Sequence, residues 1–299
     1  MAYSTPAMAF ARGTYLYSLS SFTGMIQYDW VGTFFDRERK EMYITNGGDR
    51  SIRIFNENGM ELYDFGEDQA LDGMVGSVVD EEGNILVLTL RHGSDAGYSI
   101  IKCNYRGEPV ATVEVKNLPP EFSDFIAHRM IYRNKSLYLA DMASKKIIVT
   151  EPDGRFKKGY NLPKLLELSN QQKADSGLTG FYVGLDGSMY FTISVFFKAY
   201  KLLPDGELLS FGRKGSAPGR FNVVAGIASD EKGYVYVADR LRAVVMIFDK
   251  DFKFQSEFGY RGYGPENLVA PDQIELDGKG RLYVTQMARR GVSVFKVDY

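Results

Sequence analysis

The sequence contains little cysteine or histidine: Cys103 is the single cysteine, and His92 and His128 are the two histidines. One cysteine excludes an intramolecular disulfide and a paired-cysteine haem attachment, and two histidines exclude a zinc site made from three of them. No apolar run approaches the ~20 residues that would span a bilayer. The 36 basic and 38 acidic residues nearly cancel to a net charge of −2. This balance argues against a general polyanion-binding surface but allows a local basic patch.

Aromatic side chains and glycine, by contrast, are abundant among the 299 residues. Phe, Tyr and Trp make up 14% of the chain, and 31 glycines divide it into short stretches. This mixture favours many short strands separated by turns. The length suffices for one large domain or two small ones with a substantial core.

The first twelve residues form a segment of their own. Ala7-Met8-Ala9 has the small-x-small pattern that a signal peptidase reads, but the basic and apolar segments that normally precede it are missing. Residues 1–12 are therefore either the remnant of a signal peptide or a plain tail. We favour export, which predicts a periplasmic or extracellular protein, and a cytoplasmic location stays open.

A repeat of 43 to 52 residues organises the rest of the chain. Each copy centres on an apolar anchor, as in the segment Gly233-Tyr-Val-Tyr-Val-Ala-Asp239, and further short strands follow it. The anchors are Tyr43, Leu86, Tyr138, Tyr190, Tyr236 and Tyr283. Each copy reads as four short antiparallel strands, and stacking six such sheets around an axis leaves only short edges exposed.

The last copy provides a test of this arrangement, because it ends after three strands at Tyr299. The missing strand is found at the other end, where Tyr15–Leu19 has the pattern of Glu61–Phe65. We therefore predict an all-β, six-bladed β-propeller over residues 13–299, with the N-terminal strand closing the last blade on Val292–Lys296. One short surface helix is predicted near residues 163–174, between a proline and a following glycine.

Two copies carry a recognisable pattern. Phe211-Gly-Arg-Lys-Gly-Ser-Ala-Pro-Gly-Arg-Phe221, followed by Tyr236-Val-Ala-Asp239, resembles a full NHL repeat, and Phe258-Gly259 through Thr285 resembles a second. The other four copies are degenerate. The likeness covers residues 13–299 and implies a six-bladed propeller of the kind found in exported bacterial NHL-repeat proteins. It does not settle activity, because the fold hosts lyases, lactonases and binding modules alike.

In a propeller, ligands most often meet the face where the innermost strands begin. Counting along each copy places Gly32, Gly76, His128, Gly180, Gly226 and Gln273 at this first position. Close crowding of the inner strands explains the glycines best. If the protein is an enzyme, a histidine general base with carboxylates, namely His128, Asp141 and Asp239, is the catalytic set. Asn46, Asp141 and Asp239 form a weak calcium candidate of the lactonase type; the simpler interpretation is that these groups serve turns.

The distribution of charged residues over the predicted propeller is a stronger indication of function than these catalytic and calcium candidates. The loops on the same face are rich in cations in blades 4–6, and blade 4 adds two phenylalanines. We predict a binding face made of Arg213, Lys214, Arg240, Arg242, Arg289 and Arg290 with Phe196, Phe197 and Gln273. We expect replacement of Arg242, Arg289 and Arg290 to abolish binding and leave stability nearly unchanged. The alternative is that the arginines pair with nearby acids and the phenylalanines fold down onto a neighbouring blade.

These features favour a non-enzymatic interaction module that binds a protein partner and needs no cofactor. The family resemblance makes a redox protein, such as a multihaem cytochrome, one possible partner. The alternatives are a lyase or lactonase-type hydrolase at the channel mouth and an RNA-binding NHL propeller. Nucleic acid is disfavoured, because the rest of the chain is acidic.

Overall fold

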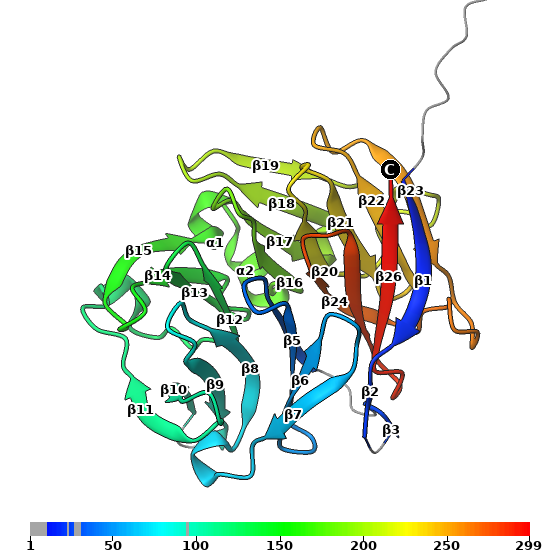
Figure 1. Cartoon of the computed structure of the whole chain (residues 1–299). Coiled ribbons are helices and arrows are strands. Elements are labelled where there is room, and N and C mark those ends of the chain that lie inside the picture. Colours follow the sequence, from blue (N-terminus) through cyan, green and yellow to red (C-terminus); the bar gives the residue numbers. More distant parts are fainter. Residues whose placement is uncertain (1–10, 23, 27–30, 94–95) are drawn as a thin grey trace, which may run out of the picture.

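Short strands of alternating side chains assemble into six four-stranded antiparallel sheets, the blades of a β-propeller (Figure 1). The computed structural model describes residues 11–22, 24–26, 31–93 and 96–299. Residues 1–10, with the predicted cleavage motif Ala7–Ala9, lie outside the described residues. From the innermost strand outward, blade 1 comprises β4 (Gly32–Asp36), β5 (Glu41–Asn46), β6 (Ser51–Asn56) and β7 (Glu61–Phe65). Blade 2 comprises β8 (Met74–Val79), β9 (Ile85–Arg91), β10 (Gly97–Cys103) and β11 (Pro109–Val113). Blade 3 comprises β12 (Arg129–Arg133), β13 (Ser136–Asp141), β14 (Lys146–Thr150) and β15 (Phe156–Asn161).

The remaining three blades follow the same order. Blade 4 comprises β16 (Gly180–Val183), β17 (Met189–Ile193), β18 (Lys198–Leu202) and β19 (Leu208–Phe211). Blade 5 comprises β20 (Val224–Ser229), β21 (Val235–Asp239), β22 (Val244–Phe248) and β23 (Phe254–Gly259). Blade 6 comprises β24 (Pro271–Leu276), β25 (Arg281–Gln286), β26 (Val292–Asp298) and β1 (Arg12–Ser18). A small hairpin of β2 (Ser20–Ser21) and β3 (Gly24–Met25) follows β1.

The sixth blade joins the two ends of the chain, as predicted. β1 runs antiparallel to β26, from Arg12 opposite Asp298 to Ser18 opposite Ser293, and the two strands lie side by side in Figure 1. The Leu19 amide continues the pairing by donating to the Val292 carbonyl at 2.8 Å. The closing strand begins three residues earlier than the predicted Tyr15–Leu19. Because β1 pairs with β26, the third strand of this blade has no exposed edge.

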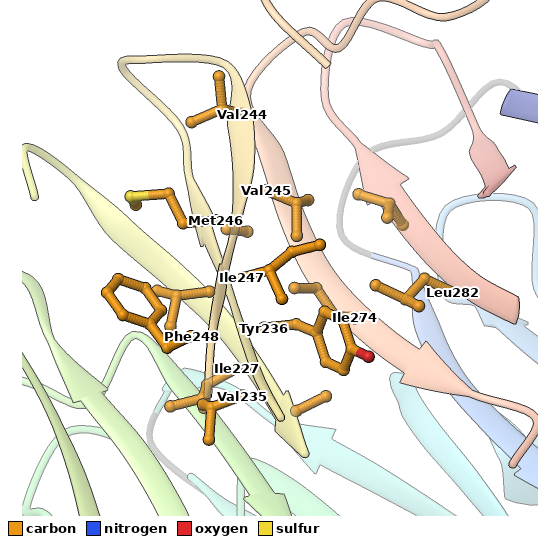
Figure 2. Close-up of a cluster of buried hydrophobic side chains, with 14 of the residues drawn as sticks. Ile227, Val235, Tyr236, Val244, Val245, Met246, Ile247, Phe248, Ile274 and Leu282 are labelled. Carbon is orange, nitrogen blue, oxygen red and sulfur yellow. The ribbon is translucent and has the colours of Figure 1, made fainter. Parts of the chain in front are cut away.

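The aromatic anchors hold neighbouring blades together. Tyr236 and Tyr283 are both 0% exposed. Figure 2 shows Tyr236 of β21 beside Ile274 and Leu282, which come from β24 and β25 of the next blade. Because both faces of each sheet are covered by other sheets, residues of the second strands are buried on both sides, which explains their nearly continuous apolar sequence.

The predicted helix is divided into two. α1 (Leu162–Leu165) and α2 (Asn170–Asp175) replace the single helix expected over 163–174. The break follows from local chemistry: Glu167 has a left-handed φ of 51°, and Ser169 starts a new helix through a capping box with Gln172. No helix in the described ranges is long and apolar enough to cross a membrane.

Closure of the sixth blade by β1 can be tested by truncation. Deletion of residues 1–18 should lower the free energy of unfolding by about 4 kcal/mol or more, roughly 10 °C in Tm, because it exposes the edge of β26. Deletion of residues 1–10, which keeps β1, is the matched control in differential scanning calorimetry. Equal melting temperatures for the two truncations would contradict closure by β1.

Candidate functional site

The innermost strands approach one another so closely that half of the positions around the axis admit only glycine. A Cβ atom on Gly180 or Gly226 would lie 2.2 Å from the carbonyl oxygen of Ala225 or Asp272 on the next blade. One on Gly32 would lie 2.7 Å from the Val75 carbonyl oxygen. Gly76 differs, because a Cβ there would meet no atom within 4 Å. Crowding therefore explains three of the four glycines, and open space remains beside the fourth.

Strand register corrects the sequence count in blade 3. Gly32, Gly76 and Gly180 lie opposite Thr45, Leu88 and Thr192, two residues after their anchors. In blade 3 the matching residue, Ala140, pairs with Arg129 and not with His128. The cause is a tight two-residue turn, Asn134-Lys135, with φ of 49° and 59°. We name the resulting set the axial ring: Gly32, Gly76, Arg129, Gly180, Gly226 and Gln273.

His128 precedes β12 and is paired with Asp141. The His128 Nδ1 lies 3.4 Å from Asp141 Oδ1, and the imidazole side chain is 34% exposed. Hydrogen bonding to Asp141 raises the pKa of His128 above its usual value, although burial opposes this. Burial alone would raise the pKa of Asp141, but His128 and the amides of Ser144 and Ile126 lower it to about 2. The carboxylate thus stays ionised, and its contribution to stability is lost only as the pH falls from about 4 toward 2.

The other candidate acidic and amide groups serve the backbone. Both carboxylate oxygens of Asp239 accept amide hydrogen bonds, from Asn222 at 2.7 Å and from Val223, Leu241 and Arg242 at 3.0–3.2 Å. Asn46 Oδ1 accepts from the Gly48 amide at 3.0 Å. Asp141 and Asp239 lie on different blades. Within the part of the chain that the structure describes, no three His, Cys, Asp or Glu side chains are grouped to hold a metal ion.

Several arginines of the predicted binding face are structural, which corrects the expectation that they are free surface groups. Arg242 is 9% exposed and pairs at 2.6 Å with Glu257, which is 6% exposed. Arg240 pairs with Asp272 of the next blade. Arg290 donates to the carbonyls of Tyr263, Gly264 and Asn267 at 3.2, 2.9 and 3.5 Å. Their charges are used to hold the inter-blade loops in place.

The phenylalanines are also partly used inside the protein. Phe196 ends a short 3-10 turn, and it packs on the core of blade 4, while Phe197 packs on the core shared with blade 5. The ammonium group of Lys214 lies 5.0 Å from the centre of the Phe197 ring. Lys214 and its neighbour Arg213 are exposed. Gln273 Nε2 donates to the Val31 carbonyl at 2.9 Å and so ties blade 6 to blade 1.

Four large apolar side chains that the sequence analysis missed are exposed on the same face. They lie in loops between second and third strands or in the link into blade 6, both of which fall at this end of an antiparallel blade. Together with three exposed cations they form what we call the blade 4–6 rim: Val195, Leu241, Tyr260 and Tyr263 with Arg213, Lys214 and Arg261. The exposed fractions of the apolar members are 53%, 55%, 56% and 93%. The pair of tyrosines after Phe258-Gly259 was the available sequence signal.

Comparison with known proteins shows the fold and little more. No family model matches the sequence. Fifty-two residues, 17% of this chain, are 46% identical to Protein lin-41 of Caenorhabditis elegans, and they span 4% of that protein's length. The resemblance to NHL repeats therefore stays a prediction.

Three solved structures similar to this chain are distant from it in sequence. A Bacteroides thetaiotaomicron protein of unknown function has a TM-score of 0.67 and 14% identity, over 96% of this chain and 76% of that one. A gluconolactonase from Xanthomonas campestris has a TM-score of 0.60 and 12% identity, over 99% and 94%. A streptogramin B lyase has a TM-score of 0.58 and 12% identity, over 98% and 100%. At such identities the likeness is one of fold alone.

The structural role of Arg242 predicts a stability defect. Arg242→Met should lower the free energy of unfolding by about 3 kcal/mol, because it leaves the buried Glu257 carboxylate without its partner. Arg213→Met, which removes an exposed arginine from the same face, should change it by no more than about 0.5 kcal/mol. Urea denaturation compares the two variants. Equal stability would show that the Arg242–Glu257 pair contributes nothing.

The His128–Asp141 pair predicts a pH dependence of stability. Since the folded pKa of His128 is raised, its stabilisation is complete below about pH 6.5 and is lost as the pH rises through that folded pKa. The stability difference between the wild type and His128→Gln should therefore shrink by about 0.5–1 kcal/mol between pH 6 and 8.5, a small effect because the imidazole is partly exposed. A difference that is constant or grows with pH would contradict the pairing.

Proposed function

We propose that this propeller is a protein-interaction module that binds an acidic protein surface through the blade 4–6 rim. The observation that carries the proposal is the exposure of Val195, Leu241, Tyr260 and Tyr263 at neighbouring loop tips. Exposed tyrosines and aliphatic side chains flanked by cations have the composition of interface anchors, which lose little conformational entropy when buried. Their solvation in the free protein is unfavourable, and a partner that covers them removes this cost.

The charge of the rim defines the chemistry of the partner. Five fully described segments form this end of blades 4–6: 194–197, 212–223, 240–243, 260–270 and 287–291. Glu266 is the one acidic residue among them, whereas Arg213, Lys214, Arg261 and the predicted Arg289 are exposed cations. A surface with acidic residues around an apolar centre is complementary to this arrangement. An acidic multihaem cytochrome, the redox partner considered from the family resemblance, fits that description.

Two other functions receive less support. RNA binding would draw on the same cations, but Arg240, Arg242 and Arg290 are already engaged by Asp272, Glu257 and backbone carbonyls. A lyase or hydrolase would depend on His128 and Asp141, whose side chains are 3.4 Å apart at this face. The third proposed member, Asp239, is bound by four backbone amides on a different blade.

The interaction can be tested by affinity capture from extracts of the source cells. Leu241→Asp combined with Tyr263→Ser should abolish recovery of the partner that the wild-type protein retains, because both changes remove apolar area at the rim and one adds a repelling charge. Recovery should weaken as salt rises, since the partner is acidic. Tyr105→Ser is the matched control. Tyr105 is 71% exposed and lies beside Arg106, in a turn between third and fourth strands at the opposite end of blade 2.

Mass spectrometry of the captured chains decides between the outcomes. The proposal requires the same acidic protein with the wild type and with Tyr105→Ser, and its loss with the double variant. Equal recovery with all three proteins, or a partner without acidic surface charge, contradicts it. Thermal melts of each variant show whether a loss of capture comes from unfolding.

A further inference from the structure

Arg129 is the exceptional member of the axial ring. It is the first residue of β12, it is half-buried, and it stands where four other blades carry glycine. In the part of the chain that the structure describes, its guanidinium forms no hydrogen bond and no ion pair. By contrast, the Arg133 Nε on the same strand donates to the Val183 carbonyl at 3.2 Å. The guanidinium group therefore has five N–H donors near the axis that a ligand can use.

Strand geometry directs this guanidinium to the centre of the ring. Arg129, Ile131 and Arg133 share one face of β12, and the Arg133 bond to Val183 shows that this face is turned toward blade 4. There the neighbouring position in the ring is Gly180, and the next is Gly226, neither of which has a side chain. Arg129 is electrostatically coupled to Asp272 and Arg240, which belong to blades 6 and 5. The long side chain therefore reaches toward the opposite side of the axis.

The charges around the guanidinium leave an excess of positive charge. Arg240 is paired with Asp272, and His128 with Asp141, whereas Arg129 and Arg133 form no ion pair among the described residues. Burial lowers the pKa of Arg129, Asp272 opposes this effect and Arg240 reinforces it, but an arginine keeps its charge at physiological pH. Further along the axis lies Glu275, where burial raises the pKa to about 7 against the effect of Arg133 and Arg37. It thus carries only part of its negative charge near neutral pH.

The ring also offers room and apolar contact. A Cβ on Gly76 would meet no atom within 4 Å, so there is open space beside this member of the ring. Next to Arg129 on the same face, Ile131 is half-buried, and so is Phe181 on β16. Residues of inner strands that keep partial exposure provide apolar surface near the axis. A ligand can therefore carry a short hydrocarbon part as well as a charge.

We propose that the axial ring binds one small organic monocarboxylate, held by the guanidinium of Arg129. The planar pair of donors matches a carboxylate, and the half-buried Ile131 and Phe181 favour an organic acid over sulfate or phosphate. This site is separate from the blade 4–6 rim and does not depend on the proposed function. It makes the propeller a protein that senses or retains a small acid at its centre.

Calorimetric titration of the full chain with sodium acetate at neutral pH and constant ionic strength tests the proposal. We expect one site with a Kd of about 1 mM or tighter. Arg129→Met should weaken binding at least tenfold, because it removes the only uncompensated cation of the ring. Arg213→Met, which removes an exposed arginine from the rim, should bind acetate as the wild type does. Sodium sulfate and sodium phosphate should bind more weakly than acetate.

A second measurement follows the pKa of His128, which lies next to Arg129 in the sequence. Arg129 lowers the pKa of His128 by its positive field. Bound acetate neutralises that field, so acetate should raise the pKa of His128 measured by NMR in the wild type but not in Arg129→Met. The ring signals of His92, on the blade 2 loop, provide an internal reference that should not respond to acetate.

The outcomes separate clearly. Absence of acetate binding, equal affinity in Arg129→Met and wild type, or tighter binding of sulfate or phosphate each overturns the proposal. If Arg129→Met does not fold, Arg129→Lys replaces it, because lysine keeps the charge but lacks the paired planar donors. We then expect acetate binding to weaken several-fold and the response of the His128 pKa to shrink. Unchanged acetate affinity in a folded Arg129→Lys also overturns the proposal.

Discussion

The close approach of the innermost strands is the constraint on which the rest of this propeller depends. Carbonyl groups of one blade lie where a Cβ of the preceding blade would be, as at Gly180 and Gly226. This contact fixes how the blades are spaced around the axis, and so it fixes the distances at which the aromatic anchors must fill the space between sheets. Only the backbone of glycine permits it without displacing a neighbouring strand. Blades 3 and 6 depart from the rule, and in blade 3 the departure puts an arginine at the centre of the molecule.

Much of the architecture could be predicted from the sequence, because it follows from periodic features. The anchors recur at repeat spacing, and the last copy lacks one strand while the N-terminus has one to spare. Contacts between individual side chains on different strands were harder to predict. The pairing of Arg242 with Glu257 depends on the register of β22 and β23, which places Met246 opposite Glu257 and brings the carboxylate beneath the preceding loop. The error at His128 came from a turn that is one residue shorter than the turn of blade 4, and a one-residue slip moves a side chain to the other face.

The loop face thus contains two chemically different regions. At the rim, exposed tyrosines and aliphatic side chains stand among solvated cations, which suits a broad and partly apolar protein contact. At the axis, charges are few and partly desolvated, and Arg129 has no ion-pair partner among the described residues, which suits a small and specific ligand. The arginines Arg240, Arg242 and Arg290 lie between these regions and stabilise the loops that support both. Half of the six cations predicted for this face, Arg240, Arg242 and Arg290, therefore stabilise its loops, while Arg213, Lys214 and Arg289 are exposed on it.

The pairing of β1 with β26 has a consequence for biosynthesis. β1 leaves the ribosome first, yet its partner is synthesised only after five blades have been made. During translation the nascent chain therefore carries an unmatched strand whose hydrogen-bonding groups are available to other polypeptides. A chaperone that shields this segment until release would raise the yield of folded protein.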